Sequence, residues 1–453
     1  MTSLLNTANA LGVYEEAMNL TANNVANANT PGYAKQTMTF EAMPFDLAVG
    51  LPGGVAAGAP QNSRNAYLEQ AVRDQQTSNT FYQQKVADLT PVQTYFDLSS
   101  TSGIAPSMST LFNDFSQLSV NPNDSVLRQT VLNDAATVAE NFNSAASGLA
   151  SQATEIQQQT SGAIQNINEL AGQIAGINSQ AQVDQAGGTD AGVDAQLNSS
   201  LEQLSQLVNF TVLQQPDGTV SVYLGGQTPL VIGNQTYAVQ GDFTTPQIAI
   251  DSNTGTDITS QLTGGQLGAL LDDKNNLLPS YITGLNTLAQ SFADQVNSAL
   301  DNGIDQNGAA PPTDLFSYNA AVGAAQSLAV NPLTPDQIAA ASPGAPGGNG
   351  NALVLANLAN QPTVDGATFS QYYGTLGEQV GSGLSTAQAN QSTSQSLLNQ
   401  AQAQREQVSG VSIDEEAESL LQYQRSYQAL SKMLGVLNSV TDTLMNMMGV
   451  VTT

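Results

Sequence analysis

Carboxylates are the only abundant side chains in this 453-residue chain that could do acid–base or metal chemistry. The sequence contains no histidine and no cysteine, which excludes the usual zinc sites, serine–histidine triads and cysteine nucleophiles. Two groups of neighbouring carboxylates remain, Asp272-Asp273 and Asp414-Glu415-Glu416. Adjacent residues on a helix point in different directions, so neither group predicts a converging acid–base pair. We expect a solvated helix face at the first group, a helix cap at the second, and no enzyme activity.

Loops rich in glycine and asparagine offer no clearer site. Residues 301–308, DNGIDQNG, have the composition of a calcium loop but lack its ligand spacing and closing glutamate, so they predict a turn-rich loop. The glycines at 225–226 and 344–350 have no nearby lysine and no strand–loop–helix context for a phosphate. The sequence therefore predicts no catalytic residue, no metal site and no cofactor.

The charge of the chain is one-sided. Lys+Arg number 9 against 37 Asp+Glu, and no basic residue lies between Arg128 and Lys274 or between Lys274 and Arg405. Nucleic acid and anionic lipid are not expected partners, because the chain has almost no basic side chains to bind their phosphate groups. No apolar run is long enough to insert into a membrane. The first basic residue is Lys35, so a secretory signal peptide is not expected, and the residues alone predict a cytoplasmic protein.

Each end of the chain carries a narrow apolar stripe with helical spacing. The N-terminal stripe consists of Leu4, Ala8, Leu11, Met18, Ala22 and Val25. The C-terminal stripe consists of Leu420, Tyr423, Tyr427, Leu430, Leu434, Leu437, Leu444 and Met448. Ser412 and Glu415 fit a capping box at the start of the second helix. Stripes this narrow predict coiled-coil seams, which need partner helices from the other terminus or from neighbouring copies.

The middle of the chain combines long helices with a β-patterned insert. Residues 126–181 predict one long helix whose apolar phase shifts by an extra four-residue step after Ile156, and further helices are expected at 267–300 and 369–408. Alternation between Phe210 and Ile258 predicts strands, with a hairpin turn at Pro216-Asp217-Gly218. Residues 301–350 are loop-rich.

These patterns predict a mainly α protein with an inserted β domain, an α+β fold in which several domains are nested. Residues 1–60 plus 405–453 would form a terminal coiled-coil domain. Residues 61–205, 263–300 and 350–404 would form a bundle of long helices, and 206–262 a small β-rich outer domain. Residues 301–349 would associate with either the β-rich or the helical domain.

The segment ANNVANANTPGY, residues 22–33, marks the end of the N-terminal helix. Pro31 biases Thr30 out of the helical region, and Gly32 allows an open turn. The segment resembles the N-terminal signature of bacterial flagellar axial proteins, the rod, hook and hook-associated proteins. The residues that carry this motif are Asn23, Asn24, Ala26, Asn27, Asn29, Thr30, Pro31, Gly32 and Tyr33. Residues 409–430, SGVSIDEEAESLLQYQRSYQAL, resemble the C-terminal signature in the form carried by the hook-associated protein 1 family.

Inner segments at 264–297, 303–308 and 336–353 are also similar to that family, which argues against a rod or hook protein. The resemblance implies a structural adaptor at the hook–filament junction. Its implied partners are other copies of itself in a tube, the hook protein, hook-associated protein 3, and an export chaperone on the C-terminal helix. It also implies an extracellular location in the flagellum, reached through the flagellar type III channel without a cleaved signal peptide.

On this interpretation the terminal stripes form the assembly interface. The residues expected in it are Leu4, Leu11, Met18, Val25, Leu420, Tyr423, Tyr427, Leu430, Leu434, Leu437 and Leu444. Two alternatives stay open. One is another axial protein, such as hook-associated protein 3 or a rod component. The other is a secreted adhesin-like surface protein, which exposed aromatic groups on the β-rich domain would favour, with Tyr223 and Tyr237 as candidates.

Overall fold

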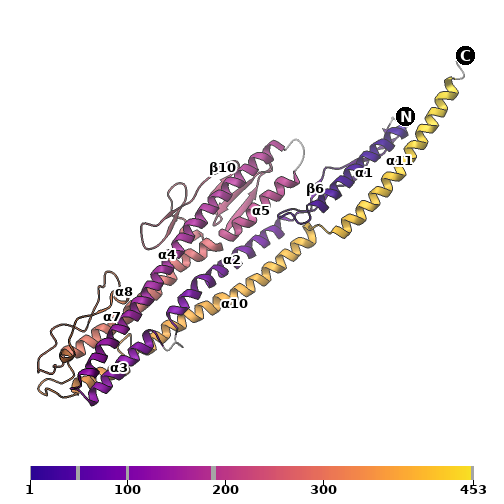
Figure 1. Cartoon of the computed structure of the whole chain (residues 1–453). Helices are drawn as coiled ribbons and strands as arrows, with labels where there is room; N and C mark the ends of the chain where they lie inside the picture. Colours follow the sequence, from indigo (N-terminus) through magenta and orange to yellow (C-terminus); the bar gives the residue numbers. More distant parts are fainter. Residues whose placement is uncertain (1, 47–50, 98–101, 185–189, 450–453) are drawn as a thin grey trace.

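The computed structural model is an elongated molecule with a narrow arm and a broader body (Figure 1). It describes residues 2–46, 51–97, 102–184 and 190–449. The first helix, α1, and the last helix, α11, form the arm and run in opposite directions, so both ends of the chain lie towards its tip. The remaining helices and the large sheet form the body. The mainly α fold with an inserted β domain is therefore confirmed.

Helices account for most of the chain, and several are very long. Their bounds are α1 Thr2–Ala26, α2 Ala66–Tyr95, α3 Ile104–Val120, α4 Ser125–Asp184, α5 Ala191–Leu207, α6 Gly265–Asp272, α7 Leu278–Asp301, α8 Ala324–Ser327, α9 Gly350–Asn357, α10 Phe369–Ser409 and α11 Ile413–Gly449. A π-helical turn, Asp273–Leu277, joins α6 to α7, so the helix expected at 267–300 is one continuous run with a bulge. None of the described helices is long and apolar enough to cross a membrane.

The strands form small antiparallel sheets. Their bounds are β1 Gln36–Thr37, β2 Phe40–Ala42, β3 Phe45–Asp46, β4 Leu51–Pro52, β5 Val55–Ala57, β6 Gln61–Asn62, β7 Phe210–Gln214, β8 Val220–Leu224, β9 Thr228–Ile232, β10 Gln235–Thr236, β11 Gln240–Asp242, β12 Ala249–Asp251, β13 Phe316–Ser317 and β14 Ala329–Val330. The largest sheet has the order β10-β9-β8-β7. The predicted hairpin is confirmed: β7 pairs with β8, and Gly218 in the turn has a φ of +77°.

The body has two large hydrophobic cores, and α4 runs through both; a small third cluster, Val72, Leu398 and Ala401, lies between α2 and α10. The first core lies among α3, the first half of α4, α7, α9 and the start of α10. Its centre is Phe292, which contacts four other phenylalanine rings: Phe112, Phe142, Phe316 and Phe369. The second core lies among the later half of α4, α5, α6 and the four-stranded sheet. The phase shift after Ile156 falls where α4 leaves the first core, and Ile164 begins its contacts with the second.

One region differs from the sequence-based expectations, and for a second the expectation had left two alternatives open. The described residues between 36 and 62 form the strands β1–β6, which were not predicted because each strand is only two or three residues long. Residues 301–349 are loop-rich, with only the short elements β13, α8 and β14 and one 3₁₀ turn, and they bury apolar side chains. Leu315, Phe316 and residues 338–340 belong to the first core, so this segment packs on the helices.

Candidate assembly site

The two terminal signatures meet at the base of the arm. Asn24, from the first signature, and Glu416, from the second, are both almost fully buried, and Asn24 Nδ2 donates a hydrogen bond to Glu416 Oε2 at 3.1 Å. These residues are 392 positions apart in the chain. Burying a carboxylate is costly unless it is paired and hydrogen-bonded, so this contact fixes where α11 begins relative to the end of α1. Glu416 was expected to act as a helix cap, and that assignment is incomplete because its side chain points into the arm.

Asn24 also holds the chain that leaves α1. Its amide forms a two-way contact with Gln36 of β1: Nδ2 donates to the Gln36 carbonyl at 2.9 Å, and Oδ1 accepts from the Gln36 N–H at 2.9 Å. The Tyr33 hydroxyl lies 2.9 Å from Asn24 Oδ1 and 3.0 Å from Asn23 Oδ1. Burial, followed by the negative charge of Glu416, raises the pKa of Tyr33. Every polar atom of the Asn24 side chain is therefore used to close the turn.

Lys35 supplies the positive charge at this point. Its Nζ lies 3.1 Å from a carboxylate oxygen of Glu415 and 3.1 Å from one of Glu416. Burial acts to lower the pKa of Lys35, but the two carboxylates outweigh it and the pKa is raised. The backbone of Lys35 also joins two distant segments, since its N–H donates to Ser409 and its carbonyl accepts from Ser63. Lys35 thus links the two segments of the chain that run between the arm and the body, one after α1 and the other before α11.

A second ionic cluster ties the same turn to the body. Arg64 contacts Glu69 at 2.6 Å and Asp194 of α5 at 2.8 Å, and it donates to the Gly32 carbonyl at 2.6 Å. Arg405 of α10 lies 3.1 Å from Glu202 and 3.5 Å from Glu69. Arg64 and Arg405 were not predicted as site residues. Their rarity in an acidic chain could have marked them as candidates for ion pairs.

Gly32 is required by close packing as well as by the turn. Its φ is +74°, and a Cβ at this position would lie 2.3 Å from the backbone oxygen of Ala195 on α5. Any side chain would push the turn away from the body. The other motif residues complete the helix exit: Asn27 Nδ2 donates to the Asn23 carbonyl at 3.0 Å, and Thr30 Oγ1 donates to Asn27 Oδ1 at 3.1 Å. Ala26, Asn29 and Pro31 are exposed.

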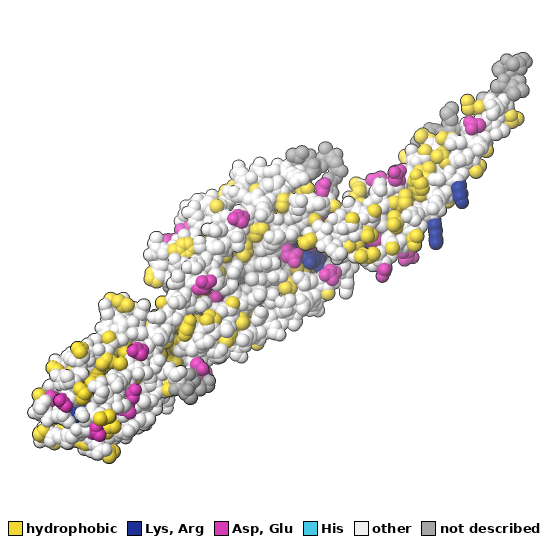
Figure 2. Space-filling view, viewed as in Figure 1, with side chains coloured by type: hydrophobic (Ala, Val, Ile, Leu, Met, Phe, Trp, Pro, Cys, Tyr) yellow, Lys and Arg dark blue, Asp and Glu magenta, His cyan; other side chains and the backbone are white. Residues whose placement is uncertain are grey.

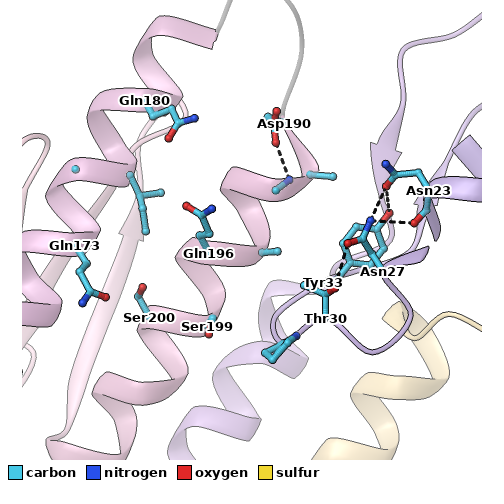
Figure 3. Close-up of a pocket in the computed structure, with 16 residues that line it drawn as sticks. Asn23, Asn27, Thr30, Tyr33, Gln173, Gln180, Asp190, Gln196, Ser199 and Ser200 are labelled. Atoms are coloured by element: carbon cyan, nitrogen blue, oxygen red, sulfur yellow. Dashed lines mark hydrogen bonds between the residues drawn. The ribbon is translucent and has the colours of Figure 1, made fainter. Parts of the chain in front are cut away.

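A groove separates this turn from the hairpin of α4 and α5 (Figure 3). Its volume is about 940 Å³, with Asn27 and Thr30 on one wall and Gln196 and Ser199 on the other. Asp190 also lines it, but this carboxylate caps α5 by accepting from the Gly192 N–H at 2.7 Å. Amides and hydroxyls can bind a polar surface through hydrogen bonds, and they offer no acid–base pair.

The arm itself is only partly closed. The predicted interface residues Leu4, Leu11 and Met18 are half-buried, as are Leu420, Tyr423, Tyr427, Leu430, Leu434 and Leu437. Val25 and Leu444 are exposed, at 39% and 56%. The most buried side chains of α1 are Thr7, Val13, Ala17, Thr21 and Asn24. All of these but Val13 are small or polar and lie one position earlier than the predicted stripe, in a row that the half-buried Ala10 and Tyr14 continue.

Small side chains in this row allow the aromatic residues of α11 to approach. Tyr14 and Tyr423 have ring centroids 6.1 Å apart, and both contact Phe40 of β2, at 5.5 and 5.9 Å. The sequence analysis missed Phe40 because no strand was predicted there. The large apolar residues of the predicted stripe consequently lie at the flank of the pair. Their role in contacts between copies remains a prediction.

The carboxylates at 272–273 correct another expectation. They were predicted to form a solvated face, but Asp273 is 1% exposed and its Oδ1 accepts from Lys85 of α2 at 2.8 Å. Lys85 also pairs with Asp272. The π-helical turn that begins at Asp273 shifts the helical phase at this point. Burial and then the charge of Asp273 raise the pKa of the neighbouring Asp88 to about 8.

This carboxylate cluster packs helices together. It joins α2 to the α6–α7 run inside the body. The loop at 301–308 is a turn, as expected, because Asp305 accepts from the backbone N–H groups of Asn307 and Ala309 at 2.8 Å each. Across the described residues, no group of three or more carboxylates is placed to hold a metal ion.

Comparisons with known proteins agree with the resemblance at both ends. The chain is 27% identical to flagellar hook-associated protein 1 of Bacillus subtilis, with 97% of each chain covered. It is 25% identical to the Escherichia coli protein of the same name, covering 98% of this chain and 100% of that one. The solved flagellar hook junction protein FlgK from Burkholderia pseudomallei matches with a TM-score of 0.65 and 18% identity, over 74% of this chain and 99% of that chain.

Two family models match separate parts of the molecule. The model of the C-terminal part of the flagellar basal body rod FlgEFG proteins matches residues 402–447, which include most of α11. The model of the helical domain of flagellar hook-associated protein FlgK matches residues 89–316 of the body, just over half of the chain. The body, more than the arm, therefore identifies the protein, and the chain belongs to the flagellar hook-associated protein 1 (FlgK) family.

Proposed function

We propose that this protein is the structural adaptor at the junction between the flagellar hook and the filament. The observation that carries the proposal is the arm: two terminal helices, locked to the body by the buried Asn24–Glu416 contact, whose apolar side chains are only partly covered. A chain that folds alone has no use for such a surface, whereas a subunit of a tube completes it with neighbouring subunits. Its family places it among the axial components of the flagellum.

The partners follow from this position. Other copies of the chain would lie beside it in the tube, the hook protein below it and hook-associated protein 3 above it. An export chaperone would cover α11 before assembly, because the exposed apolar residues of α11 would otherwise cause the chain to aggregate. The exposed side chains Leu421, Met433 and Val436 support this assignment. The chain would leave the cell through the flagellar type III channel, without a cleaved signal peptide.

The function is mechanical and not enzymatic. A layer of adaptors joins two tubes that pack differently, and each copy must present one surface to each tube. The carboxylates that could have done chemistry instead hold helices together, as the pairing of Lys85 with Asp272 and Asp273 illustrates.

The alternatives have weaker support. Hook-associated protein 3 or a rod component would share the arm, but the FlgK match over residues 89–316 favours the junction protein. An adhesin would need exposed aromatic groups on the β-rich domain. Tyr223 and Tyr237 are both half-buried, so the described part of that domain gives this alternative little support.

The test is electron microscopy of the source bacterium after deletion of this gene. We expect bare hooks on the cells and filament subunits released into the medium, because without the adaptor the filament has no base. Expression of the intact chain should restore filaments. Filaments of normal length on the deletion strain would contradict the proposal, and loss of the hook itself would indicate a rod component instead.

A further inference from the structure

We infer that Asp114 of α3 and Asp134 of α4 share one proton, and that this proton helps to hold the two helices together at the end of the body away from the arm. The contact then responds to the pH of the medium: it is closed at acidic pH and loosens when the proton leaves. This is a property of the folded body alone, so it goes beyond the proposed function and does not rest on it.

The two aspartates face each other across a helical hairpin. α3 ends at Val120 and α4 begins at Ser125, and Figure 1 shows this hairpin at the end of the body opposite the arm. The side chain of Asp134 is the hydrogen-bonding group that faces Asp114. Large apolar side chains of the same two helices belong to the first core: Leu111, Phe115, Val131 and Val138. The hairpin is therefore held by an apolar seam with an acidic contact beside it.

One oxygen of Asp114 lacks a hydrogen-bond donor. The residue is 8% exposed, and nothing in the described part of the chain donates to its buried Oδ2. A buried polar atom without a partner is costly. Two ionised carboxylates repel each other and have no proton to donate, so this pair is favourable only when one carboxyl group carries a proton and donates it to the other. Burial, followed by the hydrogen bond and the charge of Asp134, raises the pKa of Asp114 to about 7.

The other elements that pack on α3 bring no positive charge to the pair. α9 and the 3₁₀ turn Leu358–Asn360 carry no charged side chain, and the first one in α10 is Glu378. On α4 the nearest charged residues along the helix are Arg128 and Glu140. Arg128 is occupied elsewhere, because its Nη1 donates to the carbonyl of Ile338 at 2.6 Å.

The elements that pack on the first half of α4 add mainly carboxylates. Those of α7 and of the 3₁₀ turn that follows Thr334 are Asp294, Asp301 and Asp336. The basic Lys274 reaches α4 only at the carbonyl of Ala153, several turns beyond Asp134. Figure 2 shows acidic side chains along the body and few basic ones on the face in view. Among the described residues, Asp134 is the charged group that acts on Asp114, so a proton is the positive charge available to this contact.

A groove connects the pair to the medium. It lies between α3 and α4, has a volume of about 300 Å³, and is lined by Asp134 together with Thr110 and Thr137. Both threonines are exposed, and Asp134 is half-buried. The proton can therefore exchange with water, and the Asp134 carboxylate can be hydrated on this side once the proton has left. Ionisation would loosen the contact while the apolar seam keeps the helices in place.

The direction of the pH dependence follows from these groups. The folded chain keeps a proton on Asp114 that the unfolded chain releases near its ordinary pKa of 3.8, so the contact weakens as the pH rises from there to about 7. At about pH 6 the pair is mostly protonated, and at about pH 8 it is mostly ionised. Asp88 and Asp273 titrate in the same direction elsewhere in the body, so a test must isolate Asp114.

Hydrogen exchange measured by mass spectrometry isolates it. The variant Asp114→Asn keeps the shape of the side chain and gives Asp134 a permanent N–H donor. Comparing parent and variant at the same pH cancels both the intrinsic pH dependence of exchange and the titration of other groups. At about pH 6 we expect equal rates in residues 111–118 and 131–138. At about pH 8 the parent should exchange several-fold faster there than the variant.

Three controls accompany this comparison. Asp134→Asn supplies the donor from the other side of the contact and should behave like Asp114→Asn. Glu140→Gln removes an exposed carboxylate from the same helix and should exchange like the parent at both pH values. Residues 193–207 of α5 lie beside the second core and should exchange equally in every variant.

Each other outcome overturns the inference. Equal rates for the parent and both asparagine variants at about pH 8 would show that ionisation does not loosen the contact. Faster exchange in both asparagine variants at both pH values would show that the carboxylates are needed for packing in their ionised form. EDTA should leave the parent unchanged at about pH 6, and faster exchange after its addition would show that a metal ion, not a proton, closes the pair. The junction role is tested separately, by the deletion strain.

Discussion

The arm and the body of this molecule are built in opposite ways. The body buries large apolar side chains in two cores, with residues such as Phe292 and Ile174 fully covered. The arm buries small and polar side chains, such as Ala17 and Thr21, and exposes many of its large apolar ones. The body also carries the match to the FlgK helical domain, whereas α11 matches a model of rod proteins. The difference indicates that stability resides in the body, and it supports the proposal that assembly uses the arm.

Four perturbations test this division, ordered by their expected effect on the free energy of unfolding. The largest effect belongs to the first core. Phe292→Ala should lower the free energy of unfolding by about 3–5 kcal/mol, because a ring in contact with four others leaves a cavity. Chemical denaturation followed by circular dichroism measures it.

Phe45→Ala is the matched control for Phe292→Ala. Phe45 lies in β3, outside the body cores, and is 70% exposed, so its loss should change the free energy of unfolding by no more than about 0.5 kcal/mol. Equal effects at the two positions would contradict the division between arm and body.

The second effect is a loss of stability as the pH rises towards about 8. The pKa of Asp88 is raised from 3.8 to about 8 in the folded body, so the folded state keeps a proton that the unfolded chain has released. Stability is therefore lost as the pH rises between these two values, and the loss stops above about 8. Between about pH 6 and about pH 9 we expect a decrease on the order of 2 kcal/mol.

Neighbouring groups do not reverse this sign. The pKa of Asp273 is also raised, mainly by burial, so it acts in the same direction. The pKa of Asp272 is lowered, so its contribution changes only at acidic pH. Denaturation of Asp88→Asn across the same range is the check: its stability should depend less on pH. If the free energy of unfolding of this variant depends on pH as strongly as that of the parent, a group other than Asp88 causes the pH dependence.

The third effect is confined to the base of the arm. Asn24→Ala removes the hydrogen bonds that Asn24 makes to Glu416 Oε2 and to the Gln36 backbone, at a cost of about 1–3 kcal/mol, although Glu416 keeps its ion pair with Lys35. We expect faster hydrogen exchange at the Gln36 N–H and easier proteolysis after α1, while the body keeps its melting temperature. Asn29→Ala removes an exposed asparagine of the same motif and should change neither quantity.

The fourth change, Leu430→Asp, should have the smallest effect on unfolding and the largest effect on assembly. Leu430→Asp puts a carboxylate in the half-buried seam between α11 and α1, so the helices should separate. The unfolding of the body should change by less than about 0.5 kcal/mol, because no body core contains this residue. Hooks should remain bare although the variant is stable.

Secretion of Leu430→Asp must be measured separately from assembly, because the export chaperone that we propose would bind the same helix. Ser431→Asp, on the exposed side of the same turn, is the control and should assemble normally. If the Leu430→Asp variant joins hook and filament normally, the seam between α11 and α1 is not part of the assembly interface.

The long elements of the fold could be predicted from the sequence because their signals are local. The 60-residue α4 and the hairpin of β7 and β8 follow from apolar periodicity and turn residues alone. The strands β1–β6 could not be predicted in this way. Each is only two or three residues long, so they form through pairing with one another and contact with α1, not through an apolar pattern of their own.

The candidate site was predicted only in part, for a related reason. Periodicity located the seam of α1 one position too late, because it gives weight to large apolar residues and the buried row is made of Thr7, Ala17 and Thr21. The link between Asn24 and Glu416 spans 392 positions, and no local pattern predicts a contact at that distance. The π-helical turn at Asp273 likewise changes which carboxylate is buried, without any signal in the spacing.

The length of α4 has a mechanical consequence. At about 1.5 Å per residue, its 60 residues make a strut of about 90 Å that runs through both cores without a break. A force or torque applied to the far end of the body is therefore transmitted along a single rod. The body that contains this rod is joined to the arm where the chain leaves α1 and enters α11, and there Asn24, Lys35 and Arg64 form hydrogen bonds and ion pairs. Such polar contacts can break and re-form without exposing a hydrophobic core, so we expect bending to concentrate at this point.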